Sequence, residues 1–410
     1  MKTFDIPEIY KSAIIGKIKE VRRKKDKLKK DLSPTVLDFG SVKFLIARHF
    51  GFCYGVENAI EIAYKTILEN PDKRIFLLSE MIHNPEVNAD LLSRGMQFIM
   101  DTKGNQLINW EDLHANDVVI VPAFGTTLEI QAKLDSLGIN PYKYDTTCPF
   151  VEKVWNRANQ IGERGYTVIV HGKPGHEETR ATFSHSKEAA PTLVVKDMKQ
   201  AQVLAKYIKK ELATEQFYQD FAGQFSTGFN PENDLQRIGV VNQTTMLASD
   251  TQAIADYLKQ EILSFYQVDA LDTDKYFANT RDTLCYATND NQEATYALLK
   301  HSADFALVAG GYNSSNTSHI VELCEEKLPT YFIETQDKII SAQAINHFNL
   351  HEHKEQITEN YIPNKEQTTI LLTCGASCPD AIVEAILLKM VSYFETNVSI
   401  EEVLGRIDNE

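Results

Sequence analysis

Three cysteines have the surroundings of metal ligands. Cys53, Cys148 and Cys285 each stand directly before sequence of helical period, namely YGVENAIEIAYKTI, PFVEKVWNRANQIG and YATNDNQEATYALLK. A thiol at a helix N-terminus has a lowered pKa, so it is more readily the thiolate that binds a metal. One buried cysteine at such a place is usually only a small apolar side chain. Three in corresponding positions, far apart in the chain, instead suggest three similar units that each contribute one ligand.

Other side chains that suit ligand binding follow short apolar runs. Histidine, serine, threonine and asparagine can donate hydrogen bonds to an anion, and a glutamate can transfer a proton. The candidates are His83 in SEMIHN, His176 and Glu178 in GHEET, Thr244 in NQTT, Ser314, Ser315 and Asn316 in NSSN, and Ser377 in GASCPD. Turns, helix caps and interior histidines use the same residue types, so each candidate alone also has that plainer explanation.

The segment HEETR carries two adjacent glutamates with different expected directions. On an extended chain Glu177 would point away from Glu178, because successive side chains alternate sides. The segment lacks the second histidine of HExxH, so a zinc-peptidase helix is not supported.

The elements that position these residues follow one repeated pattern. Six segments run from apolar residues into a polar loop: VKFLIARHFGFCYG, DVVIVPAFGTT, YTVIVHGKPGHEE, RIGVVNQTTM, DFALVAGGYNSSN and TILLTCGASCPD. Such runs are typical of buried parallel strands, and helical sequence follows most of them, so we expect an α/β fold. Loops at the carboxyl ends of parallel strands bind ligands, and the next helix offers N–H groups to anions. The six loops together are about equally consistent with a pocket for a phosphorylated ligand and with ordinary turns between strand and helix.

Composition narrows the class of protein. The 410 residues carry a net charge of -15, which argues against a nucleic-acid binder that relies on overall charge. No apolar run approaches the roughly 20 residues needed to span a bilayer, so no membrane association is expected. The start MKTFDIPEIY has no apolar core of a secretory signal, and we expect a cytoplasmic location. In that compartment we expect the six cysteines to be free thiols, metal ligands or catalytic groups rather than a disulfide framework.

The first 40 residues look separate from the rest. The run KIKEVRRKKDKLKK, Lys17 to Lys30, has a strongly charged helical pattern with little to bury. We expect a solvated or partner-facing helix there.

Eight of these motifs, in order, resemble the LytB (IspH) family of hydroxymethylbutenyl diphosphate reductases. They are GFCYGV, SEMIHN, DTTCP, GHEET, NQTT, LCYAT, NSSN and GASCPD, and the resemblance spans roughly residues 42 to 390. It implies three similar α/β domains in pseudo-threefold arrangement around a central iron-sulfur cluster. The expected segments are a charged N-terminal extension (1–41), domain 1 (42–148), domain 2 (149–280), domain 3 (281–376) and a C-terminal segment that packs back on the core (377–410).

The resemblance also implies the cofactor. One [4Fe-4S] cluster per chain would be held by Cys53, Cys148 and Cys285. Electron carriers usually have four cysteine ligands, so a missing fourth ligand leaves one iron open to the substrate hydroxyl and marks a catalytic cluster. Cys324, Cys374 and Cys378 are expected to be non-ligands.

The implied reaction converts 4-hydroxy-3-methylbut-2-enyl diphosphate to isopentenyl and dimethylallyl diphosphate. Glu178 matches the family's proton-relay carboxylate, and Thr244 matches the hydroxyl that connects it to the substrate. The implied substrate contacts are His83, His176, Thr244, Ser314, Ser315, Asn316 and Ser377. No nucleotide-binding fingerprint is present, so electrons are expected from ferredoxin or flavodoxin.

One departure and two alternatives remain open. The family often has a histidine in a motif of the type SAHG, where this chain has PAFG with Phe124. One diphosphate donor is therefore either missing or replaced by Thr126 or Thr127. The first alternative is a zinc hydrolase in which the three cysteines hold zinc and Glu178 activates water. The second is a cluster-containing sensor whose basic N-terminal segment contacts nucleic acid or a partner.

Overall fold

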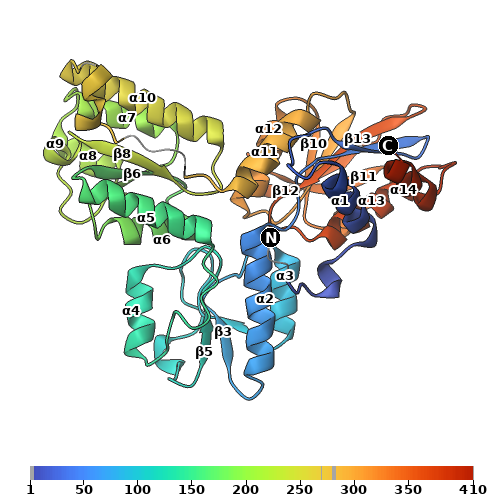
Figure 1. Cartoon of the computed structure of the whole chain (residues 1–410), viewed down its shortest axis with the longest axis horizontal. Coiled ribbons are helices and arrows are strands. Elements are labelled where there is room, and N and C mark those ends of the chain that lie inside the picture. The colour runs from blue at the N-terminus through green and yellow to red at the C-terminus, as the bar shows by residue number, and fades with distance from the viewer. Residues whose placement is uncertain (1–3, 269, 279–282, 410) are drawn as a thin grey trace. The chain divides into compact units, whose positions relative to one another are not determined.

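The computed structural model describes residues 4–268, 270–278 and 283–409 (Figure 1). Its residues group into two compact units. Unit 1 comprises Met1–Glu61, Ile82–Asp90 and Tyr286–Glu410, and unit 2 comprises Ile62–Met81 and Leu91–Cys285. Helices α2 (Tyr54–Glu69) and α3 (Pro85–Ser93) begin in unit 1 and end in unit 2.

Unit 1 is built on a five-stranded sheet. Its other elements are η1 (Glu8–Tyr10), α1 (Ala13–Lys25), β1 (Thr35–Asp38), β2 (Val42–Ile46), α11 (Tyr286–Leu298), β9 (Phe305–Ala309), α12 (Ser315–Glu325), β10 (Thr330–Ile333), η4 (Gln336–Lys338), β11 (Ala344–Asn349), β12 (Lys354–Glu359), β13 (Thr368–Cys374), α13 (Asp380–Val391) and α14 (Ile400–Asn409). The strand order is β1-β2-β13-β9-β10, parallel except for β1, which pairs antiparallel with β2. Strands β11 and β12 form an antiparallel hairpin.

Unit 2 contains two three-stranded parallel sheets. Its elements are β3 (Ile75–Leu77), β4 (Gln97–Phe98), η2 (Trp110–Asp112), β5 (Val118–Ile120), α4 (Leu128–Ser136), α5 (Pro149–Glu163), β6 (Thr167–His171), α6 (Glu177–Ser186), β7 (Thr192–Val195), α7 (Met198–Ile208), α8 (Thr214–Asp220), α9 (Pro231–Asp234), β8 (Ile238–Asn242), α10 (Ala248–Tyr266) and η3 (Ala270–Lys275). The strand orders are β4-β3-β5 and β7-β6-β8.

The β7-β6-β8 sheet shows why its strands read as continuous apolar runs. Ile169 of β6 packs with residues of α7 and α10, whereas Val168 and Val170 pack with residues of α5. Helices therefore cover both faces, and side chains on either side of the strand must be apolar (Figure 1). All five residues of β6 and of β8 are buried.

The expected α/β class is confirmed, with three sheets of parallel strands. The six segments predicted as strands form β2, β5, β6, β8, β9 and β13. The five-segment division of the chain and the arrangement of domains around a cluster stay predictions. Among the described helices, none is long and apolar enough to cross a bilayer.

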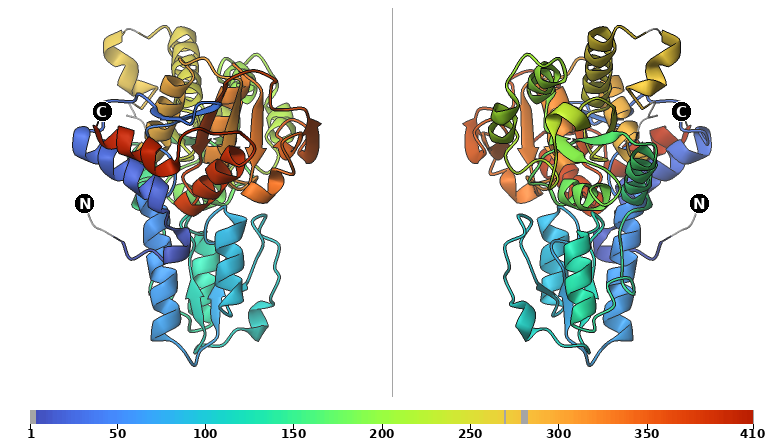
Figure 2. Two further views of the ribbon diagram at one scale, coloured as in Figure 1. Left: turned by 90° about the vertical axis from the view of Figure 1, so that its right-hand side faces the viewer. Right: turned by 90° about the vertical axis from the view of Figure 1, so that its left-hand side faces the viewer.

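The expectation that the N-terminal segment buries little was wrong. Its helix α1 exists, but Ile15, Ile18 and Val21 are buried in the core of unit 1. Helix α1 lies beside α13 and α14 of the same unit (Figures 1 and 2). The abundant lysines and arginines occupy the other faces, which hid an apolar stripe of helical spacing.

Candidate active site

Glu178 and Thr244 form a buried pair in unit 2. Glu178 lies in the first turn of α6 and is 1% exposed. The backbone N–H of Thr244 donates to its Oε1 (2.5 Å), and the Thr244 hydroxyl donates to its Oε2 (2.9 Å). Both carboxylate oxygens are thus bound by one residue, which fixes the carboxylate beside a hydroxyl that can donate and accept protons.

Strand pairing brings these two residues together. Strands β6 and β8 are parallel neighbours, with His171 opposite Asn242 at their carboxyl ends. The loops that follow therefore leave the same edge of the sheet, and one leads to Glu178 and the other to Thr244. The sequence pattern predicted this meeting of strand ends.

Gln243, in the loop after β8, binds the loop that leads to Glu178, and it was not singled out from the sequence. Its Oε1 accepts hydrogen bonds from the backbone N–H of Lys173 (3.1 Å) and the hydroxyl of Thr179 (2.9 Å). A Cβ atom at Gly172 would lie 2.6 Å from Thr179 Oγ1, so this close packing requires glycine. The sequence feature that could have identified this residue is its place inside the NQTT motif.

His176 caps α6 and contacts Phe124. Its Nδ1 accepts from the backbone N–H of Glu178 (3.2 Å), which in a neutral ring places the proton on Nε2. The Phe124 ring meets the His176 ring edge-on, with centroids 5.8 Å apart. Phe124 therefore shapes the surroundings of His176. Of the two threonines considered as replacement donors, Thr127 caps α4 by accepting from the N–H of Ile130.

Glu177 diverges from Glu178, although not for the expected reason. The two lie in the first turn of a helix, where successive side chains are rotated by about 100°, rather than on an extended chain. Glu177 accepts a hydrogen bond from the Ser79 hydroxyl.

Cys148 and Cys285 both belong to unit 2, and each directly precedes a helix. Cys148 is the N-cap of α5, and its N–H donates to the carbonyl of Ala123 (3.0 Å), next to Phe124. Cys285 directly precedes α11, and its N–H donates to the carbonyl of Thr244 (3.4 Å). The backbone of Cys285 is thus tied to the residue that holds Glu178.

In unit 1 one loop links Cys53 to three other candidates. The N–H of Cys53 donates to the carbonyl of Ala376 (3.2 Å), and the N–H of Ala376 donates to Oδ1 of Asn316 (2.8 Å). The next residue, Ser377, donates its hydroxyl to the carbonyl of His83 (3.1 Å). Four of the predicted residues are therefore linked through residues 376 and 377.

The start of α12 contains buried polar atoms without a hydrogen-bond partner among the described residues. Ser314 is the N-cap and accepts from the N–H and hydroxyl of Thr317. Ser315 and Asn316 are 3% and 4% exposed, yet Ser315 Oγ and Asn316 Nδ2 have no hydrogen-bond partner among the described residues. Because Ala376 holds Oδ1 of Asn316, the amide orientation is fixed with Nδ2 available as a donor.

His319 extends this set and was missed from the sequence. It follows Ser315 by four positions and so shares its face of α12. It is 5% exposed, its Nδ1 lies 2.6 Å from Oε2 of Glu322, and its Nε2 has no partner in the described structure. The sequence feature that could have identified His319 is its i, i+4 spacing from Ser315 in SNTSH.

The expected lowering of the cysteine pKa at a helix start is not found at Cys53. Burial raises the pKa of this thiol, and the backbone N–H groups of Val56 and Gly55 only partly oppose it. Removal of the thiol from water outweighs the helix terminus.

The donor chemistry of the three cysteines is compatible with an iron-sulfur cluster. Cysteine thiolates are the usual ligands of such clusters, and all three candidates lie at helix starts. In the part of the chain that the structure describes, no three histidine, cysteine or acidic side chains are gathered as ready metal ligands. The remaining cysteines, Cys324, Cys374 and Cys378, belong to the apolar core of unit 1.

Comparisons with known proteins agree with this chemistry. A family model described as LytB protein matches residues 44–391. The 4-hydroxy-3-methylbut-2-enyl diphosphate reductase of Synechococcus sp. (strain RCC307) is 38% identical over 365 residues, which cover 89% of this chain and 87% of that protein.

Two solved structures share the fold. One is (E)-4-hydroxy-3-methyl-but-2-enyl diphosphate reductase, described as the terminal enzyme of the non-mevalonate pathway, with a TM-score of 0.51 and 22% identity over 85% of this chain and 99% of that one. The other, the E-1-hydroxy-2-methyl-but-2-enyl-4-diphosphate reductase from Plasmodium falciparum, has a TM-score of 0.58 and 19% identity over 89% and 98%. From the family model and the sequence identity, the chain belongs to the LytB (IspH) family.

Proposed function

We propose that this chain reduces 4-hydroxy-3-methylbut-2-enyl diphosphate to isopentenyl and dimethylallyl diphosphate, the last step of the non-mevalonate pathway. The substrate gains two electrons and two protons, and its hydroxyl group leaves as water. Family membership supports the reaction. The structural observation that carries it is the buried Glu178 carboxylate bound at both oxygens by Thr244.

Glu178 and Thr244 would deliver the proton to the departing oxygen. When Glu178 is protonated, its carboxylic acid can donate to Thr244 Oγ1, and the threonine hydroxyl can pass its own proton to the substrate. The 2.9 Å distance between Glu178 Oε2 and Thr244 Oγ1 suits this transfer. Burial of the pair keeps bulk water from competing for the proton.

The electrons require a cofactor. A [4Fe-4S] cluster held by Cys53, Cys148 and Cys285 would supply them and would offer the substrate hydroxyl an iron that no cysteine occupies. The proposal is supported by the thiol chemistry of the three residues and by the family. We propose ferredoxin or flavodoxin as the protein that reduces the cofactor, and a cytoplasmic location for the enzyme.

The start of α12 would bind the diphosphate. Backbone N–H groups at a helix N-terminus favour anions, and Ser315 Oγ and Asn316 Nδ2 add two side-chain donors. His83, His176, Thr244, Ser314 and Ser377 complete the proposed substrate contacts. Of these, the Ser377 hydroxyl already donates to the His83 carbonyl, so it would have to rotate to reach a ligand.

We add His319 to the proposed diphosphate contacts. The contact between Glu322 and Nδ1 fixes the orientation of the His319 ring, so that Nε2 points away from Glu322. Where Nε2 carries a hydrogen, it would donate a hydrogen bond to a phosphate oxygen.

The direct test is turnover. We expect the full chain, purified without oxygen, to convert the hydroxymethylbutenyl diphosphate to the two isoprenoid diphosphates with a chemically reduced dye as electron source. A protein that carries iron and acid-labile sulfide but forms neither product would overturn the proposed function.

A further inference from the structure

The loop that leads to Cys53 has an unusual neighbour. Residues 47–54, here called the Cys53 loop, run from the end of β2 to the first residue of α2. Four of its side chains, two positions apart, contact residues of the N-terminal segment. They are Arg48, Phe50, Phe52 and Tyr54. Cys53 stands between the last two.

Aromatic contacts hold the end of the loop. The ring of Phe4 meets that of Tyr54 edge-on, with centroids 4.9 Å apart, and the ring of Tyr10 meets that of Phe52 at 5.9 Å. Phe4 and Tyr10 are both buried. These contacts lie on the two residues that flank Cys53 in the sequence.

Lys19 of α1 holds the middle of the loop. Its Nζ lies 4.6 Å from the ring centroid of Phe50 and donates to Oδ1 of Asp380 (2.6 Å). Gly51 has a φ of +80°, and a Cβ atom there would lie 2.8 Å from Lys19 Nζ and 2.7 Å from Asp380 Oδ1. The lysine therefore packs closely over this glycine, and a larger residue would displace it.

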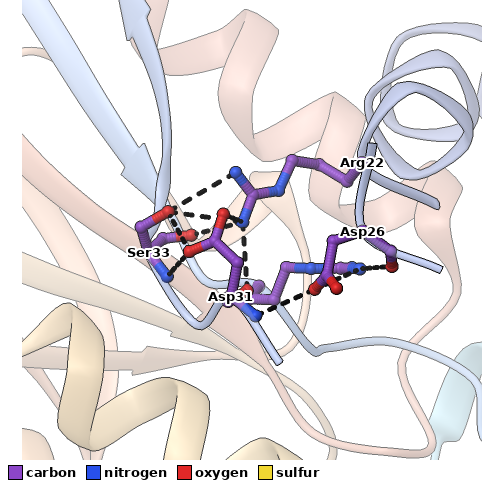
Figure 3. Close-up of polar contacts among 5 residues, drawn as sticks. Arg22, Asp26, Asp31 and Ser33 are labelled. Carbon is purple, nitrogen blue, oxygen red and sulfur yellow. Dashed lines mark hydrogen bonds and ion pairs between the residues drawn. The ribbon is translucent and has the colours of Figure 1, made fainter. Parts of the chain in front are cut away.

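Asp26, the C-cap of α1, holds the start of the loop. Its carboxylate lies 3.8 Å from the buried guanidinium of Arg48, and its carbonyl accepts from the same group at 3.5 Å. A second network fixes Asp26 itself, because the N–H of Asp31 donates to its Oδ2 (2.9 Å) and Arg22 pairs with Asp31 (2.9 Å) (Figure 3).

The N-terminal segment is itself anchored in unit 1. Ser12 caps α1, and both its hydroxyl and the N–H of Ile14 donate to the Glu384 carboxylate of α13. The apolar face of α1 is buried in the core of the same unit. The segment can therefore act as a fixed support rather than as a flexible tail.

We propose that residues 4–31 form a strap that positions the Cys53 loop and shields the Cys53 thiol. Tyr10, Lys19 and Asp26 are its positioning residues. The purpose of the strap, to keep one ligand in place for the cluster, rests on the proposed function. The shielding of Cys53 does not, and it can be measured without the cofactor.

The test compares substitutions within the strap. Lys19→Met keeps the aliphatic stem but loses the charge over Phe50 and the ion pair with Asp380, and Tyr10→Leu loses the ring against Phe52. Lys24→Met is the matched control, since Lys24 lies in the same helix, is exposed and pairs with Glu20.

In the cluster-free full chain, iodoacetamide labelling of each cysteine is followed by mass spectrometry. We expect Cys53 to react roughly three- to tenfold faster in Lys19→Met and Tyr10→Leu, with Cys148 and the control unchanged.

A second measurement uses the reconstituted protein. The visible absorption of the cluster should decay several-fold faster with an iron chelator in the two strap variants than in the parent or Lys24→Met. Unchanged Cys53 labelling in both variants, or an equal rise at Cys53 and Cys148, would overturn the strap. If the parent protein binds no iron, the proposed function fails, while the labelling rates still decide whether the strap shields Cys53.

Discussion

Glu177 and Glu178 are adjacent carboxylates with different partners, and this makes them a matched pair for mutation. Glu178→Gln keeps the size of the side chain but removes the proton that the reaction needs. We expect cluster absorption to remain and kcat to fall by about 10²- to 10⁴-fold, the usual contribution of a general acid. Steady-state rates with a reduced dye provide the measurement.

Glu177→Gln is the control, because Glu177 accepts a hydrogen bond from Ser79, whereas both oxygens of Glu178 are bound by Thr244. Its kcat should stay close to that of the parent. Equal losses in the two variants would mean that both act through the fold, and a Glu178→Gln enzyme of near-parental rate would remove Glu178 from the proton path.

His319 allows a separate test of the diphosphate site. His319→Leu keeps much of the side-chain volume but removes the Nε2 donor. A hydrogen bond to a charged group contributes about 1.5 to 3 kcal/mol, so we expect KM to rise by about 10- to 100-fold with little change in kcat. His301→Leu, at an exposed position of the same unit, should leave both constants unchanged. A fall in kcat alone would contradict a binding role.

Among the elements, those that carry the candidate site were the predictable ones. Strands β6 and β8 are apolar throughout because helices cover both faces, and this pattern can be read from one sequence. The helices after Cys53, Cys148 and Cys285 were likewise expected. The β11–β12 hairpin was not, because its residues are only partly buried and mix polar with apolar types.

Helix α1 shows how composition can mislead. Its charged residues dominate the count, whereas its packing depends on Ile15, Ile18 and Val21. The directions of side chains could not be predicted from the sequence either. The amide orientation of Asn316, for example, depends on Ala376, which lies 60 positions away. Residue types at the site could be predicted, but the partner that fixes each of them depends on the folded chain.

The packing of α1 makes a prediction about stability. Ile18 is 2% exposed in the core of unit 1, so Ile18→Ala should lower the free energy of unfolding by about 2 to 5 kcal/mol through lost burial and a cavity. The exposed Lys24→Ala should change it by less than about 0.5 kcal/mol. Urea denaturation followed by circular dichroism measures both. A solvated helix would predict small and similar effects for the two variants.

For the whole molecule, the decisive quantity is metal content, because the three-cysteine set is compatible with zinc or with iron and sulfide. We expect the chain purified without oxygen to contain iron and acid-labile sulfide, and Cys148→Ser to lose both together with activity, since a serine hydroxyl is a poor cluster ligand. Cys324→Ala is the control, because Cys324 is buried in α12 and burial raises its pKa to about 12, which disfavours the thiolate.

A colourless parent protein with one equivalent of zinc would favour the hydrolase alternative. Iron-containing protein without turnover, but with strongly salt-dependent DNA binding, would favour the sensor. Full activity in Cys148→Ser would remove this cysteine from the ligand set whichever metal is present.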